Sequence, residues 1–240
     1  MAGPLRLLEL DARSFERRLA SDPLVILPVG ALEAHGPHLP LGADQIQAEA
    51  TALAVAERLD ALVAPTLAFG SAPAAGRFPG TVSLPPSALA AHTRAVLGEF
   101  ARMGVRRLLV LSGHADRGHM AALREAAQTT MESTPAIRIA VLSDYDFVYE
   151  LRGRSAPADD GHAGLLETAR LLALAPALVG ATRPAGTLHR SPFLPGAATP
   201  AEWPESVIGD PGPATAELGR RVQEHVLARI EETVRGILPP

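Results

Sequence analysis

The chain has 240 residues, of which 47% are hydrophobic and 20% charged, and its formal net charge is -4 at pH 7. This length fits one large domain with a sizeable core, while the mild acidity and an aromatic content of 4% exclude a basic, base-stacking nucleic-acid surface. The absence of Cys and Lys excludes disulfides, thiolate metal ligands, Cys nucleophiles and the Lys of a phosphate-binding P-loop. Residues 1–18 lack the apolar core of a signal peptide, so we expect a cytoplasmic protein that binds neither membrane nor nucleic acid.

Short apolar runs alternate with helical patterns along the chain. The run "LVILPVG" at 24–30 predicts a buried strand, and the stretch at 44–60 predicts a helix that begins near Asp44. A loop rich in Pro and Gly is expected at 183–213. The remaining expected elements are strands at 61–70, 81–84, 106–113 and 136–143, and helices at 86–104, 117–131, 162–174 and 215–237.

This alternation predicts the α/β class, with a mostly parallel sheet and helices on both of its faces. Neither an internal repeat nor a linker is evident, so we expect a single domain spanning residues 1–240. Ligands of such folds bind beyond the carboxyl ends of the strands. Unusually polar segments follow the expected strands at 31–44, 71–80, 114–118 and 144–161, and these loops could converge on one site.

Five side chains in or near these segments have the chemistry of metal ligands. Glu33 and His35 are two residues apart, a spacing that aims both side chains the same way in an extended loop. Asp44, at a helix start, can bridge two cations with its two oxygens. His114 follows a strand, and Glu167 lies near the start of a helix. Three carboxylates and two imidazoles suit Zn²⁺, Mn²⁺ or Fe²⁺, and a two-metal site would lower the pKa of a bridging water and polarise a carbonyl.

Five segments of the chain resemble the creatininase (creatinine amidohydrolase) family. The resemblance implies a Rossmann-like α/β/α sandwich, a homo-oligomer that is commonly a hexamer, and two divalent metal ions per chain. It also implies a small-molecule amide, cyclic amide or formamide substrate whose C–N bond is cleaved by a metal-bridging hydroxide. The segments are "PVGALEAHGPHLPLGAD" at 28–44, "FPGTVSL" at 78–84, "SGHADRGHM" at 112–120, "HAGLLET" at 162–168 and "VIGDPGPATAELG" at 207–219.

Matching of motif positions assigns the ligands of each metal. The resemblance implies that Glu33, Asp44 and His114 hold one ion. It implies that His35, Asp44 and Glu167 hold the other. His38 is expected to bond backbone or to support a ligand, and His119 to lie on the surface of a helix.

The substrate-facing positions depart from the family pattern. The family usually has Asn-Gly-His-Gly-Gly-Asn where this chain has "SGHADR" at 112–117, and many members have Glu-His where this chain has Ala74 and Ala75. Creatinine turnover is associated with tryptophans over the pocket. The only Trp here, Trp203, is expected outside the lid, which carries Tyr145, Phe147 and Tyr149, so we expect a substrate other than creatinine.

Two further residues are candidate catalytic groups. Asp116 occupies the position where creatininase carries a Glu thought to handle a proton, so it either protonates the leaving nitrogen or forms a salt bridge with Arg117. His162 either contacts the substrate or is structural. Two other functions stay open: a peptide-cleaving relative, and a non-catalytic metal-binding scaffold or regulator.

Overall fold

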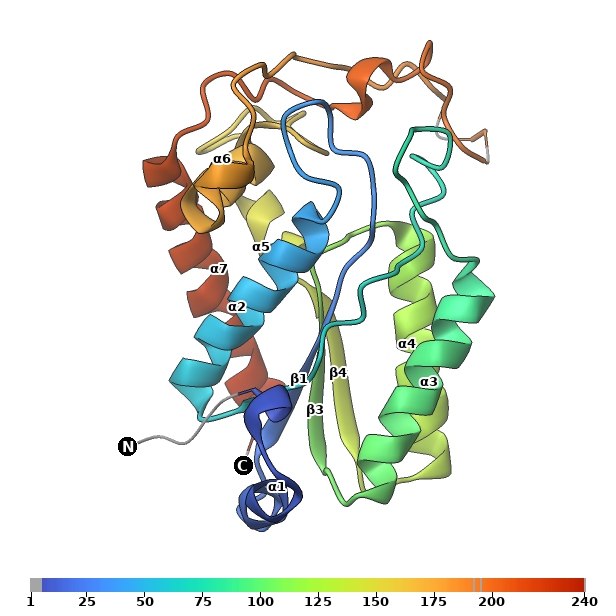
Figure 1. Ribbon diagram of the computed structural model, residues 1–240, viewed down its shortest axis with the longest axis vertical. Helices are drawn as coiled ribbons and strands as arrows, with labels where there is room; N and C mark the ends of the chain where they lie inside the picture. The colour runs from blue at the N-terminus through green and yellow to red at the C-terminus, as the bar shows by residue number, and fades with distance from the viewer. Residues whose placement is uncertain (1–5, 192, 195, 240) are drawn as a thin grey trace.

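The computed structural model describes residues 6–191, 193–194 and 196–239. Its centre is a four-stranded sheet in the order β2-β1-β3-β4, in which every neighbouring pair is parallel (Figure 1). This confirms the predicted α/β class and its parallel sheet. The strands are β1 (Leu24–Val29), β2 (Leu62–Val63), β3 (Arg107–Ser112) and β4 (Arg138–Ser143).

Helices cover both faces of the sheet, as the alternating pattern predicted (Figure 1). Successive strand residues point to opposite faces. In β1, Leu24 and Ile26 therefore pack into the core beneath α2, α6 and α7, whereas Val25 and Leu27 pack into the core beneath α3 and α4. The long helices are α2 (Ala43–Leu59), α3 (Pro86–Arg102), α4 (Arg117–Ser133), α6 (Leu165–Leu174) and α7 (Ala216–Ile237).

Shorter helical segments complete the fold. The helix α1 was not predicted; it begins after Asp11, whose side chain accepts a hydrogen bond from the Ser14 backbone N–H at 2.9 Å. The remaining segments are α1 (Ala12–Leu19), α5 (Tyr145–Val148) and the 3₁₀ turns η1 (Leu7–Glu9), η2 (Tyr149–Leu151), η3 (Pro176–Leu178) and η4 (Pro204–Ser206).

None of the helices in the described part of the chain is long and apolar enough to cross a membrane.

Two predicted strands are wrong in extent. The strand expected at 61–70 is only Leu62–Val63. The Ala64 N–H still donates to the Ile26 carbonyl, but the next bond to β1 comes from the Leu67 N–H instead of Thr66, so the regular ladder breaks at 65–66. The strand expected at 81–84 is a single antiparallel bridge between Val82 and Leu32. The helix expected from residue 162 begins only at Leu165, where the carboxylate of Asp160 accepts the first free backbone N–H groups.

The carboxyl ends of the strands face the long loops drawn at the top of Figure 1. The end of β3 approaches the start of α2 so closely that a Cβ at Gly113 would lie 2.1 Å from the carbonyl oxygen of Asp44. Only glycine fits there. This contact holds Gly113, and with it the neighbouring His114, against the first turn of α2, where Asp44 lies.

Candidate metal centre

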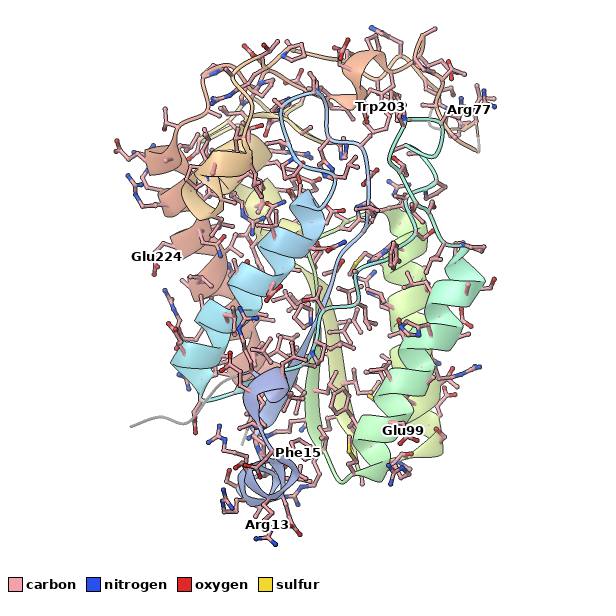
Figure 2. All side chains as sticks on the ribbon, viewed as in Figure 1. Arg13, Phe15, Arg77, Glu99, Trp203 and Glu224 are labelled. Carbon is pink, nitrogen blue, oxygen red and sulfur yellow. The ribbon has the colours of Figure 1, made fainter. Side chains whose placement is uncertain are left out.

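The loops after the strands surround a small cavity beyond the carboxyl edge of the sheet. All four polar segments that the sequence placed at this edge contribute to its wall. Trp203 lies among the loops at the same end of the molecule (Figure 2). The cavity has a volume of about 180 Å³ and is lined by Glu33, Asp44, Ala74, Gly113, His114, Ala115, Asp116, Tyr145, Tyr149, His162, Glu167 and Trp203.

The five expected ligands form two buried groups that share Asp44. Glu33, Asp44 and His114, here called the first cation position, have ligand atoms within 4.8 Å of one another, and so do His35, Asp44 and Glu167, the second cation position. His114 Nδ1 lies 3.1 Å from both Glu33 Oε2 and Asp44 Oδ2. His35 Nε2 lies 3.2 Å from Asp44 Oδ1 and 3.5 Å from Glu167 Oε1. Each oxygen of Asp44 therefore faces a different imidazole.

The remaining nitrogen of each imidazole contacts a backbone carbonyl. His35 Nδ1 lies 2.9 Å from the Glu33 carbonyl oxygen, and His114 Nε2 lies 3.1 Å from the Ser71 carbonyl oxygen. A carbonyl only accepts, so these nitrogens carry the protons. In the neutral rings, His35 Nε2 and His114 Nδ1 then present lone pairs to carboxylate oxygens, an arrangement that requires a positive charge between them.

Unpartnered buried atoms show that the donor set fits divalent cations. Glu33 Oε2, His35 Nε2 and Asp44 Oδ2 are buried without a hydrogen-bond partner. Leaving such groups uncompensated is costly in a protein interior. Carboxylate oxygens with imidazole nitrogens are the usual ligands of Zn²⁺ and related metals, and the carbonyl partners of the imidazoles are typical supports of metal-binding histidines.

Without a cation, protons supply the missing positive charge. Burial opposes protonation of His114, but the charges of Glu33 and Asp44 outweigh it and raise the pKa of His114 to about 9. Burial likewise opposes a charge on His35, yet Asp44 and Glu167 raise its pKa well above the usual value. Burial would raise the pKa of Asp44, but the two imidazoles lower it to about 2. A cation must therefore displace protons to bind.

This competition predicts a pH-dependent stabilisation by metal. Histidines of the unfolded chain have a pKa near 6.5, whereas His114 in the folded protein has a pKa of about 9. The proton on His114 therefore stabilises the apo fold fully below pH 6.5, and this stabilisation is lost as the pH rises through about 9. A bound cation replaces the proton. The His114 proton alone should therefore make the stability advantage of the loaded protein over the apo protein grow by about 3 kcal/mol between these pH values. Melting temperatures of apo and zinc-loaded protein at pH 6.5 and 9 measure this; a constant difference would contradict it.

Glu167 is held by three hydrogen-bond donors. Its Oε1 accepts from the Tyr145 hydroxyl and, at 3.0 Å, from the amide of Gln47, while its Oε2 accepts from the Ala163 backbone N–H at 2.7 Å. The sequence argument had placed Tyr145 in a lid and had not considered Gln47. Gln47 was detectable in principle, because it lies three residues after Asp44 and therefore on the same face of α2.

A fully buried ion pair lies beside Tyr145. The guanidinium of Arg170 donates to Asp144 Oδ2 at 2.6 Å and lies 5.6 Å from the centre of the Tyr145 ring. Asp144 directly follows β4, and Arg170 lies on α6 three residues after Glu167. The pair therefore ties the helix that carries Glu167 to the end of the sheet.

The other predicted histidines have defined places. His38 lies outside both cation positions, and its Nε2 donates to the Ala163 carbonyl at 3.1 Å, so the predicted backbone contact is present. His162 lines the cavity and donates from Nε2 to the Ala34 carbonyl at 2.8 Å. Its ring lies between those of His35 and Trp203, tilted against both, with ring centroids 4.3 and 5.0 Å away.

Asp116 lines the cavity, and of its two expected roles the salt bridge with Arg117 is not formed. It is the N-cap of α4: its Oδ1 accepts from the backbone N–H groups of Gly118 and His119 at 2.8 and 3.0 Å. Within the described residues it forms no ion pair with Arg117 and its Oδ2 takes part in no hydrogen bond. One carboxylate oxygen therefore caps the helix while the other stays available at the cavity wall.

One sequence expectation about these side chains is wrong. His119 is completely buried instead of lying on a helix surface, and burial, together with the neighbouring His114, lowers its pKa to about 3.

Trp203 lies outside the lid segment, as expected, but it is 3% exposed and lines the cavity. Its ring packs edge-on against Phe78 at 5.6 Å, and its indole N–H donates to the Val207 carbonyl at 3.0 Å. The absence of Trp from the lid segment therefore did not mean its absence from the pocket.

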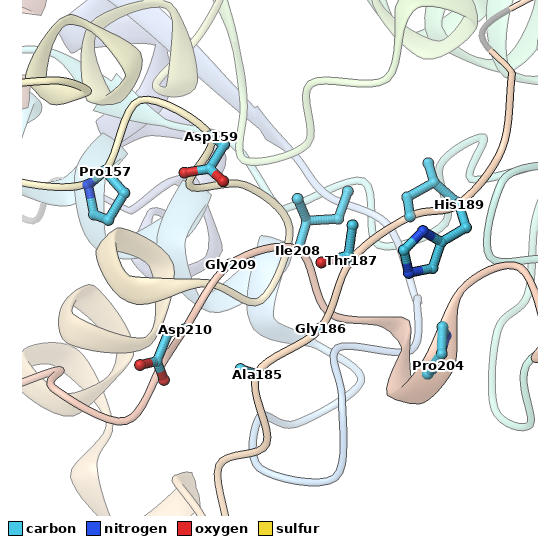
Figure 3. Close-up of a pocket in the computed structure, with 11 residues that line it drawn as sticks. Pro157, Asp159, Ala185, Gly186, Thr187, His189, Pro204, Ile208, Gly209 and Asp210 are labelled. Atoms are coloured by element: carbon cyan, nitrogen blue, oxygen red, sulfur yellow. The ribbon is translucent and has the colours of Figure 1, made fainter.

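A larger cavity of about 640 Å³ lies beside the loop that carries Trp203 (Figure 3). Asp159, His189 and Asp210 line it, and none of the five expected ligands does. The residues that line it are Pro157, Asp159, Ala185, Gly186, Thr187, Leu188, His189, Pro204, Ile208, Gly209 and Asp210.

Comparison with known proteins places these features in a family. A family model described as "Creatininase: Creatinine amidohydrolase" matches residues 8–234. A creatinine amidohydrolase of Pseudomonas putida is 32% identical over 97% of this chain and 96% of its own length. A mycofactocin precursor peptide peptidase of Mycobacterium tuberculosis is 32% identical over 95% of this chain and 90% of its own. A solved structure described as "Creatininase Mn" is 29% identical, covers 99% of this chain and 100% of that one, and gives a TM-score of 0.90.

Proposed function

This chain belongs to the creatininase family, and we propose that it is a dinuclear metal-dependent amidohydrolase of small molecules. It is a hydrolase of carbon–nitrogen bonds. The observation that carries the dinuclear proposal is the pair of buried ligand groups that share Asp44 and leave three polar atoms without hydrogen-bond partners. The relative described with Mn supports a divalent transition metal, and the same donor set suits Zn²⁺ or Fe²⁺.

The residues of this chain have distinct roles in the proposed reaction. Glu33, Asp44 and His114 would hold one cation, and His35, Asp44 and Glu167 the other. Bound there, divalent cations supply an activated water and polarise an amide carbonyl. Tyr145, Gln47 and the Ala163 N–H fix the Glu167 carboxylate, so that this ligand is oriented before a cation arrives.

Asp116 and His162 would act on the substrate. Asp116 Oδ2 would deliver a proton to the leaving nitrogen, directly or through a water. His162 lines the cavity together with Trp203, whose indole N–H is bonded to Val207, so Trp203 offers the substrate an apolar wall. A cavity of about 180 Å³ limits the part of the substrate near the cations to a small group.

A substrate panel tests the activity and its specificity. The zinc- or manganese-loaded protein should hydrolyse some of the small amides, cyclic amides and formamides offered, and the chelated protein none. We expect creatinine to rank well below the best substrate. Ala74, at the cavity wall, stands where many relatives have the Glu of the Glu-His pair, so a polar contact is missing there. Creatinine turnover equal to the best in the panel would contradict this expectation, and no turnover of any member by loaded protein would favour a non-catalytic metal-binding scaffold.

Peptide cleavage is the second candidate function. It is supported by the mycofactocin precursor peptide peptidase, which matches nearly the whole chain. Including short peptides in the same panel separates the two candidates, because a peptidase should cleave a peptide faster than any free small amide.

We also propose that the chain acts as a single domain in the cytoplasm and as a homo-oligomer, with the hexamer as the first candidate. Exposed apolar side chains such as Phe69, Val82 and Met103, which are 50%, 45% and 38% exposed, are available for such contacts. Sedimentation of the purified protein measures the oligomeric state.

A further inference from the structure

His119 is a buried histidine outside the five proposed metal ligands, and both of its nitrogens are hydrogen-bonded. Nδ1 accepts from the Ser71 backbone N–H at 3.1 Å, and Nε2 lies 3.1 Å from Ser112 Oγ. The Ser112 hydroxyl donates its proton to the His114 carbonyl at 2.7 Å, so Ser112 Oγ is the acceptor for His119 Nε2–H. The ring is therefore neutral and held in one tautomer.

The peptide group at Ser71 connects this ring to a proposed ligand. While its N–H donates to His119, the Ser71 carbonyl accepts from His114 Nε2 at 3.1 Å. That bond leaves His114 Nδ1 as the nitrogen that faces Glu33 and Asp44. The direction of the Ser71 peptide thus decides which nitrogen of His114 is available to a cation.

Close packing fixes the peptide against the ring. A Cβ at Gly70 would lie 2.7 Å from two atoms of the His119 ring and 2.6 Å from the Gly30 carbonyl oxygen. The His119 backbone is held as well, because its N–H donates to the capping carboxylate of Asp116 at 3.0 Å. The rings of His114 and His119 are perpendicular, with centroids 5.0 Å apart. His119, residues 70–71 and His114 therefore form one rigid unit.

We propose that His119 is a positioning residue: through the Ser71 peptide it fixes the tautomer and direction of His114 and so sets the affinity of the first cation position. This inference rests on the proposed function only in taking His114 as a ligand. Loss of an outer hydrogen-bond partner of a metal-binding histidine typically costs 10–100-fold in metal affinity. None of His35, Asp44 and Glu167 shares a hydrogen bond or a ring contact with His119, so the second cation position should keep its affinity.

Zinc titration of the full-length apo protein against a competing chelator tests the proposal. The wild type should bind two ions. His119→Phe keeps the ring volume but removes both nitrogens, and it should weaken one of the two binding constants by roughly 10–100-fold. His119→Asn should recover most of this loss, because its amide oxygen can accept from the Ser71 N–H. His38→Phe removes another buried imidazole, one that contacts neither Ser71 nor His114, and should leave the first cation position at wild-type affinity.

The outcomes separate this proposal from the function on which it rests. If the wild type binds no zinc, the proposed metal centre itself is wrong. If the wild type binds two ions and His119→Phe binds both with unchanged affinity, only the positioning role is overturned. Equal weakening of both constants would also overturn it. Combining His119→Phe with Glu33→Ala assigns the effect: with the first position already impaired, the second constant should be the same with and without the His119 change.

Discussion

Replacing Asp44 by Ala is expected to abolish binding of both metal ions and the hydrolytic activity with them. Its two oxygens lie 3.2 Å from His35 Nε2 and 3.1 Å from His114 Nδ1, so Asp44 is the carboxylate that belongs to both cation positions. The loss of affinity should exceed the roughly 10–100-fold that follows removal of an outer hydrogen-bond partner. Elemental analysis after loading with Zn²⁺ or Mn²⁺ and removal of free metal measures the occupancy.

Glu33→Ala is the matched control for this experiment. It removes a carboxylate that belongs to the first cation position and not to the group of His35, Asp44 and Glu167, so it should chiefly weaken one ion and leave the second bound. Asp44→Asn keeps the volume of the side chain and separates the loss of charge from the loss of packing. Retention of one full equivalent of metal by Asp44→Ala would show that Asp44 does not bridge two cations.

The position of the candidate ligands was predictable from the sequence. Parallel strands end at one edge of a sheet, so the polar segments that follow β1, β3 and β4 had to meet there. Glu33 and His114 each lie within four residues of a strand end, and Asp44 lies in the first turn of α2. The core fixes the positions of strand ends and of first helical turns. The local sequence pattern was therefore sufficient to predict where these residues lie.

The walls of the cavity were not predictable in the same way. Trp203 lies in the Pro- and Gly-rich segment at 183–213, where no periodicity relates sequence to burial, and its place is set by contacts with Phe78 and His162. His119 lies in the first turn of an amphipathic helix and was expected on its surface. It is buried because residues 70–71, which are distant in sequence, pack against its ring.

Asp116→Asn is expected to keep both metal ions and the fold while lowering kcat by about 10²–10⁴-fold, the usual effect of removing a general acid or base. Asn is as good an N-cap as Asp, so its side-chain oxygen can still accept from the N–H groups of Gly118 and His119. The substitution therefore removes the ionisable oxygen at the cavity wall without removing the cap. Measurements of kcat, metal content and melting temperature on this variant follow the three effects separately.

Asp116→Ala completes the comparison, because it removes the cap as well as the charge. It should lower stability by about 1 kcal/mol and reduce kcat as far as Asp116→Asn does. If capping is the only role of Asp116, the two variants will differ: Asp116→Asn will match the wild type in every measurement, and Asp116→Ala will lose stability alone. An unchanged kcat in Asp116→Asn with both ions bound would therefore leave Asp116 a structural residue. The proton for the leaving nitrogen would then have to come from His162 or from solvent. His162 is the next residue to replace, since it is the imidazole among the lining residues that is not assigned to a cation position.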